Sequence, residues 1–194
     1  MSERESVILD AQKGEALARF GEDYRRMVLI ASDAFVKMMS TLNAFGSAGF
    51  TMFYMMGQEK GRCDVLQEME VLRQQGVFFT KRQVLENIIH QIRITGWGAP
   101  MIRTYNEKSG SLSVIVENNP IVTALGTDVR SDRPLCHYFR GYWVGVVSAV
   151  FEKKVKCTET KCMSMGDAYC EFNVTTAHAE DGADLLHEMA KRMR

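Results

Sequence analysis

The sequence has no excess of charge of either sign, and this absence excludes one broad class of function. Among its 194 residues, 24 are Lys or Arg and 24 are Asp or Glu. Its only basic cluster, Lys191, Arg192 and Arg194, is shorter than the basic patches that bind nucleic acid. We therefore expect no direct contact with nucleic acid.

Long hydrophobic runs are also missing. The chain begins with charged and polar residues, without the apolar core of a signal peptide. Its most apolar stretch, residues 34–57, is interrupted by Lys37, Asn43 and a Gly-Ser-Ala-Gly break, and a bilayer-spanning helix carries such residues only at a cost. We expect a cytoplasmic protein without a membrane span, in which the five cysteines are thiols or metal ligands rather than disulfides.

The first half of the chain has the pattern of helices. Apolar residues recur every three or four positions over residues 10–45, although Gly21 interrupts the pattern. A second helix is expected from residue 49 to about 75, where Gly76 ends it. Thr80 is a good N-cap for a third. The pair Gly57 and Gly61 allows a neighbouring backbone to come close.

The second half mixes strands and helices. Alternating residues predict one hairpin from residues 101–105 and 112–116, and a second from 154–160 and 169–175. A helix from Pro134 to Phe151 lies between them, and another is expected after residue 180. The expected fold is therefore α+β, with an antiparallel sheet of two hairpins packed with several helices.

Four of the five cysteines lie between Cys136 and Cys170. A hairpin that carries Glu159, Cys162 and Cys170, joined by Cys136 at a helix start, can assemble a tetrahedral metal site. Three sulfur ligands favour zinc or iron over magnesium or calcium. The spacing alone leaves two alternatives open, because buried free cysteines are common as small hydrophobic residues, and Cys157 lies on the same side of its strand as Glu159. We expect the fifth cysteine, Cys63, to be part of the core.

Three segments of the sequence resemble the 4-vinyl reductase domain family. They are Cys136-His-Tyr-Phe-Arg-Gly-Tyr-Trp-Val-Gly145, Thr158-Glu-Thr-Lys-Cys162 and Gly166-Asp-Ala-Tyr-Cys-Glu-Phe172, and Gly96-Trp97-Gly98 is similar to the family's G-W-G. The resemblance covers roughly residues 15–175. It implies a fold shared with haem-based nitric oxide sensors and with subunits of a vesicle-tethering complex.

The resemblance also implies a ligand set. Phenol-responsive sensors of this family bind zinc through three Cys and one Glu, and the matching positions here are Cys136, Glu159, Cys162 and Cys170. This match favours Glu159 over Cys157. Because four protein ligands leave no open position, we expect a structural Zn²⁺ rather than a catalytic one, with iron as the alternative.

The family fold further implies an apolar pocket near the metal. Candidate lining residues are Phe53, Tyr54, Phe78, Phe79, Trp97, Tyr105, Tyr138 and Trp143. Any of these aromatic side chains can instead simply fill the core. We expect residues 1–45 to form an N-terminal helical segment that mediates homodimerisation, residues 46–175 to form the 4-vinyl reductase-like domain, and residues 176–194 to form a C-terminal helix.

Three functions are consistent with these features. The first is a sensor or carrier of a small hydrophobic, aromatic or tetrapyrrole-like ligand, which passes its signal to a protein partner. The second is an enzyme or accessory factor in bacteriochlorophyll vinyl-group metabolism, although no nicotinamide or flavin motif is found. The third is an assembly subunit that binds no ligand. We favour the first.

Overall fold

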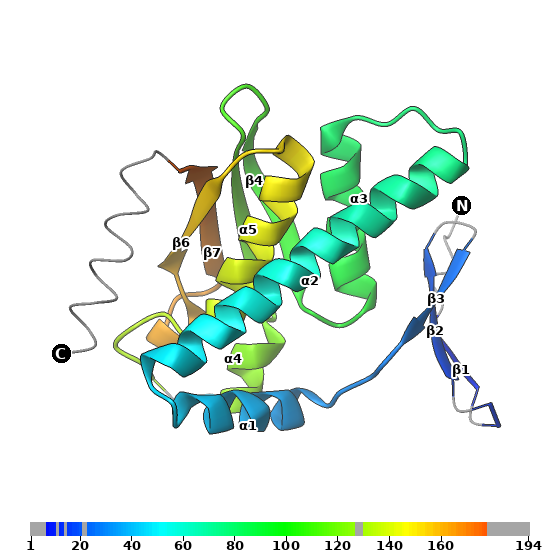
Figure 1. Ribbon diagram of the computed structural model, residues 1–194. Coiled ribbons are helices and arrows are strands. Elements are labelled where there is room, and N and C mark those ends of the chain that lie inside the picture. Colours follow the sequence, from blue (N-terminus) through cyan, green and yellow to red (C-terminus); the bar gives the residue numbers. More distant parts are fainter. Residues whose placement is uncertain (1–6, 11, 14, 21–22, 127–129, 178–194) are drawn as a thin grey trace.

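The computed structural model describes residues 7–10, 12–13, 15–20, 23–126 and 130–177. Its elements, in chain order, are β1 (Val7–Asp10), β2 (Glu15–Phe20), β3 (Asp23–Met27), α1 (Ser32–Asn43), α2 (Ser47–Gln74), α3 (Lys81–Ile94), β4 (Ala99–Asn106), β5 (Ser111–Glu117), α4 (Pro120–Leu125), α5 (His137–Phe151), β6 (Val155–Lys161), the 3-10 turn η1 (Met163–Met165) and β7 (Cys170–Thr176). Figure 1 shows their arrangement.

The expected α+β architecture is confirmed. Two antiparallel hairpins, β4–β5 and β6–β7, join through β5 and β7 into a four-stranded sheet of order β4-β5-β7-β6. Leu112, Val114 and Val116 on β5 alternate with residues of the other face and are almost fully buried. They belong to the same hydrophobic core as Trp143 on α5. The core therefore lies between one face of this sheet and the helices.

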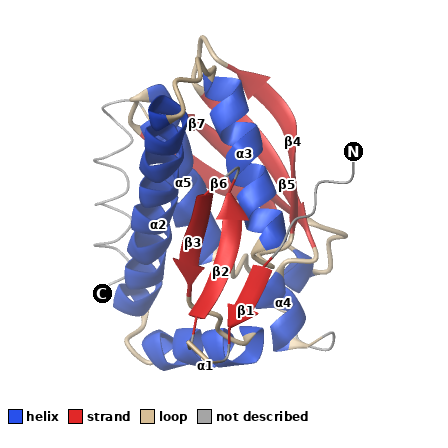
Figure 2. Cartoon of the chain, turned by 90° about the vertical axis from the view of Figure 1, so that its right-hand side faces the viewer, coloured by secondary structure: helices blue, strands red, loops and turns tan. Residues whose placement is uncertain are grey.

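The helix expected over residues 10–45 is largely wrong. Among the described residues of this segment, only Ser32–Asn43 is helical, and residues 7–27 contain the three strands of a second antiparallel sheet, of order β1-β2-β3. The apolar residues of this segment have helical spacing, but Gly14 and Gly21 divide it into pieces of strand length. In Figure 2 this sheet lies in front of the layer that contains α2 and α3.

Helices α2 and α5 approach each other closely along a seam of four glycines. A Cβ atom at Gly57 or Gly61 would lie 2.1–2.2 Å from a carbonyl oxygen of α5, and one at Gly141 or Gly145 would lie 1.9–2.0 Å from a carbonyl oxygen of α2. The expectation that Gly57 and Gly61 admit a neighbouring backbone is confirmed. The seam fixes the separation of the two helices, because only glycine leaves room for the facing backbone.

Of the remaining helices, one was predicted correctly, one was not predicted, and one lies almost wholly outside the described residues. Helix α3 begins at the predicted N-cap Thr80, whose hydroxyl and the Gln83 side chain form a capping box. The short helix α4 was not predicted. The helix expected over 176–194 lies almost wholly outside the described residues, which end at 177. In the described part of the chain, no helix has the length and apolar character needed to cross a membrane.

Candidate metal centre and adjoining cavity

Four buried side chains meet where α5 begins. Cys136 is the N-cap residue of α5, Glu159 lies on β6, Cys162 follows β6 directly, and Cys170 begins β7. One potential ligand atom from each lies within 4.8 Å of those of the other three. The fold thus brings together the four residues that the sequence indicated as metal ligands, although the outermost two, Cys136 and Cys170, are 34 positions apart.

The sulfur geometry fits a tetrahedral metal ion. The Cys136 Sγ atom lies 3.8 Å from both the Cys162 Sγ and the Cys170 Sγ. A regular tetrahedron with metal–sulfur bonds of about 2.3 Å has edges of about 3.8 Å. A disulfide requires a sulfur–sulfur distance of about 2.05 Å. The spacing therefore matches three ligands of one ion.

Glu159 supplies the fourth corner. Its Oε2 accepts a hydrogen bond of 3.3 Å from the Cys136 backbone N–H, whereas its buried Oε1 has no hydrogen-bond partner. A buried carboxylate oxygen without a partner carries a large desolvation cost. A cation among the three sulfurs would satisfy this oxygen, so the donor set fits zinc.

Neutral donors surround the sulfur atoms. The fully buried Asn119 side chain donates to the Cys136 Sγ at 3.2 Å and to the Cys170 Sγ at 3.4 Å. The Met163 backbone N–H donates to the Cys170 Sγ at 3.4 Å, and the Ser164 hydroxyl lies 3.0 Å from the Cys162 Sγ. Such groups orient metal ligands and stabilise thiolates. Asn119 was not predicted, although an Asn-Pro pair before a helix marks it as an N-cap.

The four acidic groups perturb one another strongly. Hydrogen bonds from Cys136 and Cys170 hold the pKa of the Cys162 thiol well below its usual range. Burial, followed by the neighbouring Cys162, raises the pKa of Glu159 to about 8. Buried like charges at this distance oppose each other's ionisation unless a cation lies between them. Full deprotonation of this set therefore requires a metal ion.

The two remaining cysteines have different environments. Burial raises the pKa of the Cys157 thiol to about 12, and Cys157 does not belong to the four-residue cluster on the described part of the chain. Cys63 was expected in the core, and this is wrong: it is half-buried on α2, with its Sγ 3.5 Å from Glu59 Oε1. The residue pattern of α2 does not show which of its faces meets a cavity rather than the core.

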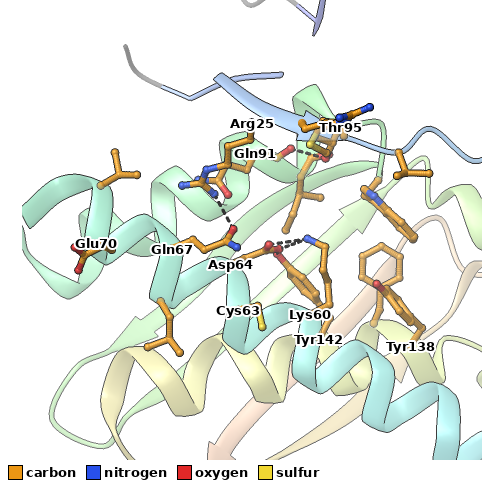
Figure 3. Close-up of a pocket in the computed structure, with 18 of the residues that line it drawn as sticks. Arg25, Lys60, Cys63, Asp64, Gln67, Glu70, Gln91, Thr95, Tyr138 and Tyr142 are labelled. Atoms are coloured by element: carbon orange, nitrogen blue, oxygen red, sulfur yellow. Dashed lines mark hydrogen bonds and ion pairs between the residues drawn. The ribbon is translucent and has the colours of Figure 1, made fainter. Parts of the chain in front are cut away.

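A cavity of about 920 Å³ lies on the other side of α5 from the sheet, between α2, α3, α5 and the N-terminal strand β3. Figure 3 shows the side chains that surround it. Its lining residues are Arg25, Arg26, Met27, Val28, Lys60, Cys63, Asp64, Leu66, Gln67, Glu70, Val71, Gln74, Gln91, Ile92, Thr95, Trp97, Tyr138, Phe139 and Tyr142.

Two of the candidate pocket residues line this cavity. Trp97 and Tyr138 stack against each other there, with ring centroids 5.3 Å apart and an angle of 16° between the ring planes. The other candidates lie elsewhere: Phe53 and Trp143 in the core, Tyr54 and Phe79 packed against it, Tyr105 against Phe151, and Phe78 on the surface.

The polar wall of the cavity was not predicted. Asp64 on α2 accepts hydrogen bonds from Lys60 at 2.6 Å and from the Tyr142 hydroxyl at 3.0 Å. One turn further along α2, the buried Glu68 forms an ion pair of 3.6 Å with Arg25 of β3. The Lys60–Asp64 spacing is a sequence signal for a helical ion pair. No local signal could have placed Arg25, because its segment was interpreted as helix.

Residues 112–176 match the family model of the V4R domain, which confirms the resemblance to the 4-vinyl reductase family. All four residues of the metal cluster lie within this segment. An uncharacterised protein of Methanocaldococcus jannaschii, MJ1642, is 40% identical to the chain over 42 residues, which are 22% of this chain and 26% of that protein. The chain thus spans about a quarter of the length of the curated relatives that it matches.

Solved structures share the fold. The phenol-responsive sensory domain of the transcription activator PoxR, solved with phenol, superposes with a TM-score of 0.76 and 19% identity over 93% of this chain and 90% of that one. An H-NOX protein from S. oneidensis, in its Fe(II)NO state, superposes with a TM-score of 0.50 and 13% identity over 83% and 84% of the two chains. At these identities the likeness establishes the architecture alone.

Proposed function

We propose that this chain, whose residues 112–176 match the V4R domain, is a small-molecule-binding module that senses or carries a hydrophobic or aromatic ligand and contains a structural zinc ion. The observation that carries the proposal is the cavity of about 920 Å³. One of its walls is α5, which begins at the cysteine cluster. Cavities of this size accommodate drug-sized ligands.

The zinc is assigned a structural role because the protein supplies all four ligands. Three thiolates and one carboxylate complete a tetrahedron and leave no position for water or substrate. The ion ties the start of α5 to β6 and β7 and so contributes directly to folding. Iron also accepts sulfur-rich ligand sets, and elemental analysis distinguishes the two metals.

The shape and chemistry of the cavity support an aromatic ligand. The stacked rings of Trp97 and Tyr138 form part of an apolar wall, to which Phe139 and Ile92 contribute. Aromatic rings bind other rings in stacked or edge-on geometry. The PoxR domain of the same fold responds to phenol, which is consistent with a ligand of this class.

A sensor passes on its ligand signal through contact with another protein chain. We propose that the chain forms a homodimer through the N-terminal segment of residues 1–45, continued onto the start of α2. Several large apolar side chains there are about half or more exposed: Met38, Phe45, Met52, Met55 and Met56. Contiguous exposed apolar surface marks an interaction site. Sedimentation of the purified chain tests this, because a monomer at micromolar concentration contradicts it.

Metal analysis tests the first half of the proposal. Protein purified without added metal is expected to contain one zinc per chain and to lose it in the Cys162→Ala variant. Cys63→Ala is the matched control, because Cys63 lies outside the cluster and should keep the zinc. Absence of metal from the wild-type protein, or equal metal in both variants, contradicts the assignment.

Ligand binding is tested at Cys63 as well. Cys63→Trp places a large ring in the cavity, whereas Cys63→Ser changes the same wall by one atom and leaves the cavity open. We expect 2-naphthylmethanol to raise the melting temperature of the wild type and of Cys63→Ser, and not that of Cys63→Trp. Equal shifts in all three proteins would place binding elsewhere. A Soret-like absorption band in the purified protein would instead indicate a tetrapyrrole.

A further inference from the structure

The cavity contains a carboxylate that is held in place by an uncharged donor. Asp64 projects from α2 with only 14% of its side chain exposed, and the buried Tyr142 hydroxyl donates to its Oδ2 at 3.0 Å. Tyr142 is itself fixed by α5, which packs against α2 along the glycine seam. The position of this carboxylate is therefore set by the core of the protein.

The counter-ion of Asp64 is held much less firmly. Lys60 lies one turn earlier on the same helix, its side chain is 49% exposed, and its Nζ is 2.6 Å from the carboxylate. Pairs of this kind on a helix surface change an equilibrium constant by only about twofold. Figure 3 shows the two side chains pointing toward each other among the residues that line the cavity. An ammonium group that entered the cavity could replace Lys60 at little cost.

The same asymmetry recurs at Glu68. This buried carboxylate accepts hydrogen bonds from Asn87 at 2.8 Å and from Gln91 at 2.5 Å, both on α3. Its cation, Arg25, comes from strand β3 of the N-terminal sheet. The carboxylates of Asp64 and Glu68 are thus both held by uncharged donors from the helices, while Lys60 of α2 and Arg25 of β3 supply their cations.

The opposite wall suits a cation as well. Tyr138 lies close enough to Asp64 for its pKa to be raised to about 12, by burial first and then by the carboxylate charge. Its ring stacks with Trp97 on the cavity wall. The faces of Trp and Tyr rings attract positive charge. A ligand held between Asp64 and this stacked pair would therefore meet an anion and an aromatic wall.

We propose that the cavity binds a protonated amine carried on a flat apolar body. The ammonium group takes the place of Lys60 at Asp64, and the body lies against Trp97 and Tyr138. This inference rests on the proposed function and specifies its ligand class. The other charged groups of the cavity wall do not oppose it: Arg25 is paired with Glu68, Arg26 is 69% exposed and lies 3.9 Å from Glu15, and Glu70 at the rim is paired with Arg73 at 3.1 Å.

Three probes of the same shape and different charge test the proposal by titration calorimetry at pH 7. They are 2-naphthylmethylamine, 2-naphthylmethanol and 2-naphthoate. We expect the amine to bind about tenfold more tightly than the alcohol, as a charge-assisted hydrogen bond replaces a neutral one, and the acid to bind most weakly. If the alcohol or the acid binds as tightly as the amine, the amine proposal is wrong and the proposed function stands. If none of the three binds, both are wrong.

Three variants test whether Asp64 causes the preference for the amine. Asp64→Asn keeps an acceptor for Tyr142 and removes the charge, and it should abolish the preference for the amine over the alcohol. Glu70→Gln removes the same charge from the cavity rim, where Glu70 is 55% exposed, and should preserve that preference. Lys60→Ala removes the competing cation and should raise amine affinity about twofold, which provides a test even if Asp64→Asn does not fold. Unchanged amine affinity in Lys60→Ala, or a preference retained by a folded Asp64→Asn, would overturn the proposal.

Discussion

The glycine seam between α2 and α5 makes a quantitative prediction for Gly61→Ala. The added Cβ would lie 2.2 Å from the Tyr142 carbonyl oxygen, whereas an ordinary van der Waals contact begins at 3.4 Å. The two helices would have to separate locally by about 1.2 Å, the difference between these two distances. Because the obstructing atom belongs to a backbone, no side-chain rotation can relieve the clash.

The expected loss of stability follows from two opposing effects. Overpacking of a core costs about 1–3 kcal/mol or more, and the better helix propensity of alanine offsets about 1 kcal/mol. Since Gly57, Gly141 and Gly145 make equally close contacts along the same seam, we expect a cost at the upper end. The net destabilisation should be about 2 kcal/mol, which lowers the melting temperature by about 4–8 °C in a chain of this length.

Thermal denaturation followed by circular dichroism measures this effect. Arg62→Ala is the control on the same helix, because its side chain is 50% exposed and the loss of its exposed ion pair with Glu59 should change stability by no more than about 0.5 kcal/mol. A Gly61→Ala variant as stable as the wild type would show that the helices are further apart than the seam requires. The reasoning about α2 and α5 would then fail.

Three further predictions concern the metal centre and helix α3. Asn119→Asp keeps the N-cap acceptor of α4 but loses both donors to sulfur, so zinc affinity in a chelator competition should fall about 10- to 100-fold, and unchanged affinity would contradict a role for Asn119. Removal of the metal by a strong chelator should lower the midpoint of urea unfolding in the wild type, whereas a Cys162→Ala variant should not respond to the chelator. Thr80→Ala removes one side of the α3 capping box and should cost about 1 kcal/mol, measured by urea denaturation with the neighbouring exposed Arg82→Ala as control.

Local patterns in the sequence identified the elements that have strong signals of their own. The alternation on β4, β5, β6 and β7 and the N-cap Thr80 each act within a few residues, so the two hairpins and α3 were predicted correctly. The N-terminal strands were not, because Leu17, Tyr24 and Val28 also fit a helical period and strand pairing is decided by partners outside the segment. Tertiary pairing here outweighed local periodicity.

The metal cluster was predictable for a different reason. Spacing alone left Cys157 and Glu159 as rivals on one strand face, and both are indeed buried. The resemblance to the 4-vinyl reductase family favoured Glu159, which lies in the cluster.

The polar wall of the cavity had no comparable signal in the sequence. Arg25 and Glu68 are 43 positions apart, and their ion pair depends on how the N-terminal sheet packs against α2.

Helix α5 connects the two sites that define this molecule. Its N-cap residue, Cys136, is a corner of the metal cluster, and two turns of the same helix present Tyr138 and Tyr142 to the cavity. On the same stretch of α5, Gly141 and Gly145 allow close packing against α2, the helix that carries Asp64. A metal ion that fixes the start of α5 therefore also fixes the Tyr142 hydroxyl relative to the Asp64 carboxylate. If the proposed ion is bound, it would set the position of one wall of the cavity, while the glycine seam sets the distance to the other.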